Sequence, residues 1–206
     1  MCKIGGSEKI GKKKIAVLII VILLLLIGGV FLWQENKKEI KGSPEDYVIM
    51  ETEEGKFVIN EKAGLTVKVP EGWITEKIEV MHGSITFYPS DTESIRPNKK
   101  AVPPLKKGCM IEIAVGYEKT TLDEIRKEVE EAHESLIMKS DEFEIVKIDG
   151  ESALKNNFDC VDIGPSVGIY LSKENKLYSI GMTASREDVE RCSEGLDKFL
   201  ETVSIQ

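Results

Sequence analysis

The stretch that decides the fold is Cys109–Leu136, CMIEIAVGYEKTTLDEIRKEVEEAHESL. Its opening part, Cys109–Val115, repeats apolar residues with a period of two, which predicts a half-buried strand. Thr121 and Glu124 then supply the capping-box pair that starts a helix. The apolar residues after them recur at helical spacing and form the predicted buried face: Leu122, Ile125, Val129, Ala132 and Leu136.

Strand and turn signals precede this stretch. The predicted strands are Tyr47–Met50, Lys56–Asn60, Leu65–Val69, Ile74–Met81 and Ser84–Pro89. A Glu-Glu-Gly turn separates the first two, and His82-Gly83 joins the last two as a hairpin. Residues 91–108 carry three prolines and are expected to form a long loop.

The C-terminal part repeats the same signals. Asp149-Gly150 is a hairpin dipeptide that precedes a strand at Ser152–Ile163. A second hairpin is expected around Glu174-Asn175, between Val167–Ser172 and Lys176–Thr183. The final helix is predicted to begin after Ser185, and its apolar face is Val189, Cys192, Leu196, Phe199, Leu200 and Val203.

These elements predict an α+β fold. Consecutive hairpins give one antiparallel sheet of about six or seven strands, and the two amphipathic helices pack on it.

A different pattern stands at the N-terminus. The run Ile15–Trp33, IAVLIIVILLLLIGGVFLW, contains no charged residue, and as a helix it is roughly 28 Å long at about 1.5 Å per residue. It predicts a single transmembrane helix. A cleaved signal peptide is the alternative, but the run is long and lacks an A-x-A cleavage pattern. The lysines before the run predict a cytoplasmic N-terminus and an extracytoplasmic C-terminal domain.

The charge balance argues against a nucleic-acid partner. Five of the 28 Lys and Arg residues and one of the 36 Asp and Glu residues precede the run. The rest of the chain therefore carries 23 basic and 35 acidic side chains, a net charge of −12. Such an acidic domain repels nucleic acid and anionic headgroups. The predicted organisation is a basic tail at 1–14, the transmembrane helix at 15–33, a polar linker at 34–45 and an α+β domain at 46–206.

The segment Gly64–Trp73, GLTVKVPEGW, resembles the opening of PsbP-like domains: a strand, a proline, a short turn and a tryptophan. The later order is similar as well, with Asp149-Gly150 followed by Ala153, a hairpin with Leu177-Tyr178, and a terminal helix ending in Val-Ser-Ile. The resemblance covers most of 47–206. It implies a mainly non-catalytic domain, in a family that includes photosystem II subunits, nuclear-import cofactors and bacterial envelope proteins. The predicted anchor departs from the photosynthetic members and favours a membrane-anchored bacterial one.

The residues that carry chemistry offer no catalytic set. Glu130-x-x-His133 is a single Glu-x-x-His motif, and a helical di-iron site needs two such motifs. We therefore expect His133 to lie on a solvated flank of the helix. The acid pairs 123–124, 130–131 and 141–142 are expected to be solvated, and Trp73 is expected in the core. We expect no enzymatic activity, metal or cofactor.

The cysteines leave two interpretations open. Cys109, Cys160 and Cys192 lie on predicted core faces, and the absence of C-x-x-C argues against zinc or dithiol chemistry. They are either buried free thiols or include one disulfide. If a disulfide forms, the predicted pair is Cys160 with Cys192, because their elements meet at one end of the sheet. Cys109 is the free thiol or an alternative partner.

The expected function is therefore that of a membrane-anchored, extracytoplasmic, non-catalytic domain that binds a protein partner or helps to assemble a complex. A small-ligand or lipid-binding domain is the first alternative, and an envelope enzyme that uses carboxylates is the second. An exposed apolar patch favours the first interpretation, and a dry cavity favours the ligand carrier.

Overall fold

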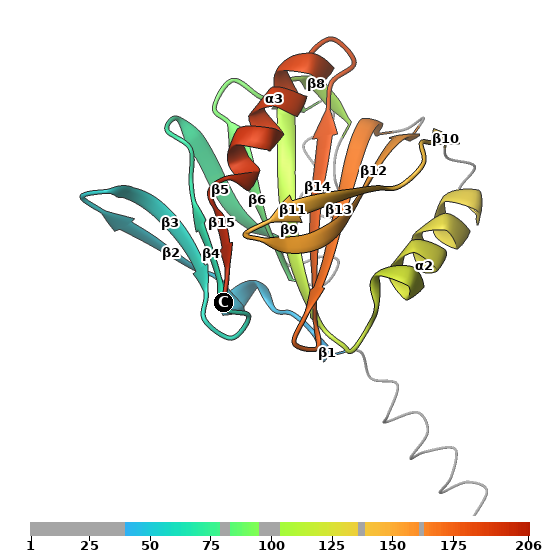
Figure 1. Ribbon diagram of the computed structural model, residues 1–206. Coiled ribbons are helices and arrows are strands. Elements are labelled where there is room, and N and C mark those ends of the chain that lie inside the picture. The colour runs from blue at the N-terminus through green and yellow to red at the C-terminus, as the bar shows by residue number, and fades with distance from the viewer. Residues whose placement is uncertain (1–39, 79–82, 95–103, 136–138, 161–162) are drawn as a thin grey trace, which may run out of the picture. The chain divides into compact units, whose positions relative to one another are not determined.

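The computed structural model describes residues 40–78, 83–94, 104–135, 139–160 and 163–206 (Figure 1). Residues 40–206 make up one unit. In these described ranges no helix is both long enough and apolar enough to cross a bilayer. The predicted tail at 1–14 and transmembrane helix at 15–33 lie outside the described residues and stay predictions.

The larger sheet, called sheet A, is built from consecutive hairpins. Counting described residues only, it has nine strands, and its main path is β10-β12-β13-β14-β9-β6-β5, antiparallel throughout. One edge of β12 is shared by β10 and β11, and β1 pairs with the end of β9. The strands of sheet A are β1 (Ile40–Lys41), β5 (Trp73–Ile78), β6 (Ser84–Pro89), β9 (Cys109–Tyr117), β10 (Lys139–Ser140), β11 (Glu144–Ile148), β12 (Glu151–Cys160), β13 (Gly164–Lys173) and β14 (Lys176–Ala184).

Two tight turns shape the C-terminal hairpins, as the sequence predicts. Asp149 and Gly150 have φ angles of 49° and 83°, and Glu174 and Asn175 have φ angles of 51° and 61°. A two-residue turn with both φ angles positive matches the right-handed twist of the strands on either side. The β11–β12 and β13–β14 hairpins therefore form where they were expected.

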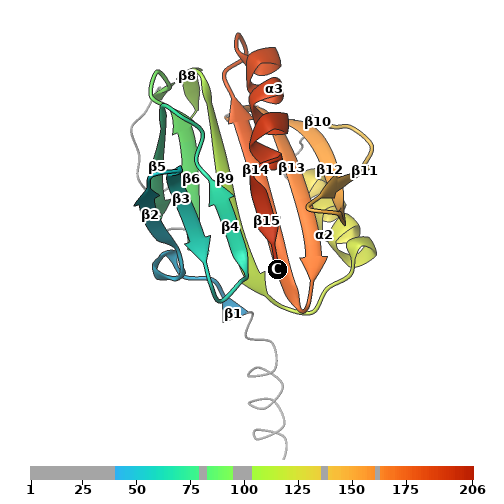
Figure 2. The same ribbon diagram turned by 60° about the vertical axis from the view of Figure 1, so that its left-hand side comes forward.

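A second sheet, called sheet B, overturns the prediction of one sheet. Its order is β15-β4-β3-β2, with β2 (Val48–Thr52), β3 (Gly55–Asn60), β4 (Leu65–Lys68) and β15 (Val203–Ile205). β15 pairs antiparallel with β4, so the chain end returns to the first hairpin (Figure 2). Val203, assigned from its spacing to the last helix, lies in this strand instead. The helix ends earlier, where the Thr202 hydroxyl donates to the Phe199 carbonyl at 2.7 Å.

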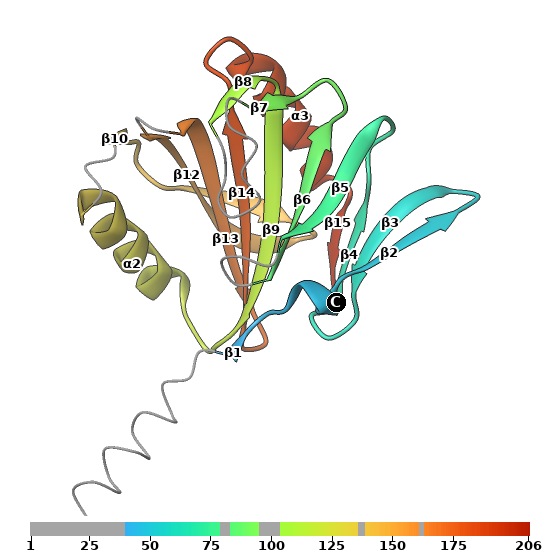
Figure 3. The same cartoon turned by 180° about the vertical axis from the view of Figure 1, so that it is seen from behind.

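The two α-helices of the described residues lie on opposite faces of sheet A. α2 (Leu122–Ser135) lies against β12 and β13, and α3 (Val189–Leu200) lies against β9 and β14 (Figure 3). Adjacent residues in a strand point to opposite faces of the sheet. In β12, Phe158 contacts α2 and the adjacent Asn157 lines a cleft beside α3, so the two helices cover opposite faces. This arrangement confirms the α+β class with helices packed on a mostly antiparallel sheet.

The predicted capping box at the start of α2 is present. The Thr121 backbone N–H donates to Glu124 Oε2 at 2.8 Å, and the Glu124 N–H donates to Thr121 Oγ1 at 3.3 Å. Each bond satisfies a backbone donor that the helix itself leaves free.

The core lies between the two sheets and α3. Ile111 and Ile113 of β9, Val67 of β4 and Phe199 of α3 are all completely buried. Tyrosine hydroxyls add links between the sheets, because Tyr178 donates to the carbonyl of Ala63 at 2.5 Å. The alternation that predicted β9 is thus confirmed, with its apolar face in the core.

The folded unit includes residues that the sequence assigns to the linker. β1 pairs with β9, and the Gly42 N–H donates to the Val115 carbonyl at 3.1 Å. Ser43 and Asp46 then form a capping box around the short 3-10 helix η1 (Pro44–Asp46). The described unit accordingly begins at Ile40 rather than at residue 46.

The expected 91–108 loop also contains two short strands. β7 (Glu93–Ser94) and β8 (Leu105–Lys107) pair as a short antiparallel ribbon.

Candidate functional site

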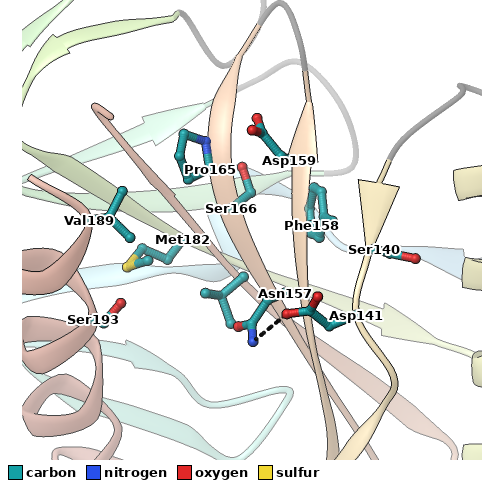
Figure 4. Close-up of a pocket in the computed structure, with 11 residues that line it drawn as sticks. Ser140, Asp141, Asn157, Phe158, Asp159, Pro165, Ser166, Met182, Val189 and Ser193 are labelled. Carbon is teal, nitrogen blue, oxygen red and sulfur yellow. Dashed lines mark hydrogen bonds between the residues drawn. The ribbon is translucent and has the colours of Figure 1, made fainter. Parts of the chain in front are cut away.

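A cleft of about 390 Å³ lies where β12 and β13 meet the first turns of α3 (Figure 4). The register places Asn157 opposite Val167 and Asp159 opposite Pro165. Val167 and Met182 are buried and form an apolar floor, and Val189 of α3 adds one wall. Polar side chains line the rest of the cleft: Ser140, Asp141, Asn157, Asp159, Ser166 and Ser193.

Hydrogen bonds hold the polar rim of this cleft in place. The Asp141 N–H donates to the Asn157 carbonyl at 2.8 Å, and Asn156 Nδ2 donates to the Asp141 carbonyl at 2.6 Å. Asp159 accepts two bonds from Arg186, at 2.7 and 3.0 Å, so one carboxylate of the rim is already neutralised. A rim with fixed hydrogen-bonding groups over an apolar floor is typical of sites that bind small polar molecules.

The cleft does not bring together a catalytic constellation. Asp141 is exposed and Asp159 is half-exposed and ion-paired, whereas carboxyl groups that act as general acids lie in dry or like-charged surroundings. Ser166 Oγ donates to the Gly164 carbonyl at 3.1 Å, and no histidine is among the residues that line the cleft. Its residues are equipped to hold a ligand by hydrogen bonds.

A second feature is an exposed apolar strand at the edge of sheet B. Val48, Ile49 and Met50 of β2 are 51%, 37% and 44% exposed. They follow one another in a strand, so apolar side chains leave both faces of it. In the described part of the chain no other strand pairs with the outer edge of β2. The sequence predicts a strand here, and the run of apolar residues without alternation is the signal that it is not half-buried.

Trp73 packs against α3 from the start of β5. Its ring stacks on Phe199, with centroids 6.0 Å apart and planes 18° apart, and it lies close to Gly195. Trp73 is half-buried rather than fully enclosed. It covers the rim of the core, since Phe199 behind it is completely buried.

The expectation of a solvated His133 is wrong. His133 is 7% exposed and packs on Phe158, with ring centroids 4.7 Å apart. Burial holds the pKa of its imidazole below the usual value. Along α2, Ile125 and His133 are buried, Val129 between them is half-buried, and Ala132 is exposed. Three residues of the predicted face, Leu122, Ile125 and Val129, are thus buried or half-buried, and His133 joins them because it packs on the Phe158 ring of β12.

The acid pairs are solvated, as expected. Their residues are all exposed: Asp123, Glu124, Glu130, Glu131, Asp141 and Glu142. Within the described ranges no group of three or more His, Cys, Asp or Glu residues is arranged to hold a metal ion.

The structure describes the side chains of two of the three domain cysteines. Cys109 and Cys192 are buried free thiols, 3% and 0% exposed, as their core positions predict. The two thiols lie within hydrogen-bonding reach of each other. Cys160 ends β12, and its side chain is outside the described part, so a bond between Cys160 and Cys192 stays a prediction.

No protein-family model matches the chain, and no curated protein matches it either. Solved structures do. Cyanobacterial PsbP (CyanoP) from Synechocystis sp. PCC 6803 has 9% identity and a TM-score of 0.47, over 78% of this chain and 92% of that one. LpqN of Mycobacterium tuberculosis, involved in cell envelope biogenesis, has 13% identity and a TM-score of 0.43, over 69% and 83%. The PA94 protein of Pseudomonas aeruginosa, of unknown function, has 9% identity and a TM-score of 0.40, over 78% and 97%. These likenesses concern the general fold, and no site or function is transferred from them.

Proposed function

We propose that this chain is a membrane-anchored, extracytoplasmic, non-catalytic domain that binds a protein partner by adding a strand of that partner to β2. The observation that carries the proposal is the exposed apolar edge formed by Val48, Ile49 and Met50. Exposed edge strands pair readily with another chain, and soluble proteins usually cover or charge them. An edge left apolar is therefore a candidate for a partner's strand.

The register of the β2–β3 hairpin supports this proposal, because it indicates which backbone groups of β2 point outward. Glu51 lies opposite Lys56, and the Lys56 carbonyl accepts from Val69 on the far side of β3. Lys56 therefore points its backbone groups away from β2. In an antiparallel pair the residue opposite does the same, so Glu51 and, two residues before it, Ile49 present their N–H and C=O groups outward.

Charge sets the chemistry of the partner. Glu51, Glu53 and Glu54 are all exposed at the hairpin tip, beside the apolar residues. The strand that fits is an extended segment with apolar residues and at least one Lys or Arg aligned with the tip. Such complementarity speeds association and selects among partners.

The N-terminal sequence supports the placement of this domain. The uncharged run 15–33 is long enough to span a bilayer, and the lysines before it favour a cytoplasmic N-terminus. Protease added to intact cells or spheroplasts should digest the C-terminal domain. Its survival, while a known outer-face marker is cleaved, would reverse the proposed orientation.

Site-specific photo-crosslinking in the full-length, membrane-inserted chain tests the binding surface. A photoreactive residue at Met50 should give a discrete crosslinked band, and the same residue at the exposed Lys127 of α2 should not. Equal crosslinking at both positions would argue against β2 as the binding surface.

Backbone variants sharpen this test. Ile49→Pro removes an outward N–H and leaves the bonds to β3 intact, so it should abolish the Met50 crosslink. Ile49→Val keeps the N–H and the strand preference and should retain it. If Ile49→Pro crosslinks like the unmodified chain, the partner does not bind by strand addition.

A small polar ligand in the cleft beside α3 is a second candidate function, favoured by its fixed rim and apolar floor. Asn157→Ala should weaken binding of a neutral oligosaccharide probe measured by calorimetry. If neither the unmodified chain nor the variant releases heat with that probe or with a polyamine, the cleft is not a site for these ligand classes.

A further inference from the structure

Two buried thiols that take no part in the surfaces described above lie against each other. Cys109 is the first residue of β9, and Cys192 lies in the first turn of α3. Their side chains are 3% and 0% exposed, both belong to one buried cluster, and the two thiols lie within hydrogen-bonding reach of each other. Residues far apart in the chain thus meet at one end of sheet A.

The backbone around both cysteines is fixed by one residue. Asp188 Oδ2 accepts the Gly108 N–H at 2.7 Å, and the Asp188 carbonyl accepts the Cys192 N–H at 2.9 Å. The Ser185 N–H also donates to the Gly108 carbonyl at 2.9 Å. The start of β9 and the start of α3 are therefore joined directly, beside the two sulfur atoms.

Ion pairs reinforce the same junction. Arg191 pairs with Asp188 at 3.2 Å and with Asp91 at 3.3 Å, and Asp91 pairs with Lys107 at 3.1 Å. These contacts tie the residues next to each cysteine to a third segment, which limits how far the two thiols can separate.

We propose that Cys109 and Cys192 form an intramolecular disulfide, which replaces the predicted Cys160–Cys192 pair and pins α3 to β9. Their contact in the folded chain means that little backbone movement is needed to join them. The inference goes beyond the proposed function, and it depends on the extracytoplasmic placement only for access to an oxidant.

The oxidant is a small disulfide such as oxidised glutathione. The Cys109 thiolate attacks one sulfur of the oxidant, a mixed disulfide forms, and one oxidant thiolate leaves. Cys192 gives its proton to water and attacks the Cys109 sulfur, and the second oxidant thiolate leaves. Two electrons pass from the two cysteines to the oxidant, and the two protons released match the two oxidant thiols formed.

The surroundings favour Cys109 as the thiol that reacts first. The hydrogen bond from Cys192 lowers the pKa of Cys109, and the Arg191 guanidinium adds to this effect, whereas burial opposes it. The hydrogen bond to Cys109 and burial raise the pKa of Cys192. Attack on an oxidant requires the thiolate form, which Cys109 reaches more readily.

Peptide mapping decides the pairing, because trypsin places each cysteine of the domain in a different peptide. Cleavage after lysine or arginine gives Gly108–Lys119, Asn156–Lys173 and Cys192–Lys198. The purified full-length chain in detergent is equilibrated with a mixture of oxidised and reduced glutathione, alkylated and digested without reductant. We expect Gly108–Lys119 linked to Cys192–Lys198, with Asn156–Lys173 alkylated.

A Cys160→Ser variant is the matched control and should retain the Cys109–Cys192 link. Reduction should lower its urea midpoint by as much as it lowers that of the unmodified chain. The Cys192→Ser variant should lose both the link and the shift. A link from Asn156–Lys173 to Cys192–Lys198, or full alkylation of all three peptides at every glutathione ratio, would overturn the inference. Because the oxidant is supplied in the tube, failure here does not depend on orientation, which the protease assay tests separately.

Discussion

Replacing Trp73 with alanine measures how much the β5 edge of the core depends on α3. Deleting a fully buried large aromatic side chain costs about 3–5 kcal/mol. Trp73 is half-buried, so the packing loss is roughly 2 kcal/mol, and its stacking on Phe199 adds about 0.5–1.5 kcal/mol. We expect Trp73→Ala to lower the free energy of unfolding by about 2.5–3.5 kcal/mol, or roughly 5–14 °C in Tm.

The assay is urea unfolding of residues 40–206, followed by circular dichroism because Trp73 itself would be the fluorescent probe. A double-mutant cycle with Phe199→Leu isolates the ring contact, and we expect a coupling energy of about 1 kcal/mol. Ile74→Ala is the control in the next residue, which is 39% exposed, and it should cost less than about 1 kcal/mol.

Two results would refute this reasoning. A loss below about 1 kcal/mol for Trp73→Ala would place the side chain on the surface and make it a candidate for stacking on a ligand. A coupling energy near zero would show that Trp73 is held by something other than Phe199.

Three further predictions follow from single contacts. The Gly108 N–H, the Ser185 hydroxyl and Arg191 lower the pKa of Asp188. The ionised Asp188 carboxylate therefore stabilises the fold fully above about pH 4, and this stabilisation is lost as the pH falls through the lowered pKa. In acid unfolding curves, Asp188→Asn should lose less stability on acidification than the unmodified chain. Gly150→Ala should cost about 1 kcal/mol in urea unfolding from its φ of +83° alone, and Gly64→Ala should cost more, because its Cβ would lie 2.6 Å from the Gln206 carbonyl. A chelator should leave the urea midpoint of the purified chain unchanged, and a fall would revive the metal site at Glu130 and His133.

Local signals in the sequence predict much of the fold. The alternation in Cys109–Val115, the capping pair of Thr121 and Glu124, and the turns at 149–150 and 174–175 each depend on neighbouring residues only, and each is present in the structure. The helical spacing after Ser185 likewise places Cys192, Leu196 and Phe199 in the core.

The sequence by itself therefore determines the long strands, both helices and which face of most of them is apolar, because these follow from local backbone preference and periodicity. Only the tertiary structure decides the pairing of β15 with β4, which splits off sheet B, and the Phe158 ring that buries His133. The same is true of the exposed edge of β2 and of the meeting of Cys109 with Cys192. Each depends on residues distant in the chain, and no local pattern encodes which distant surface a segment will contact.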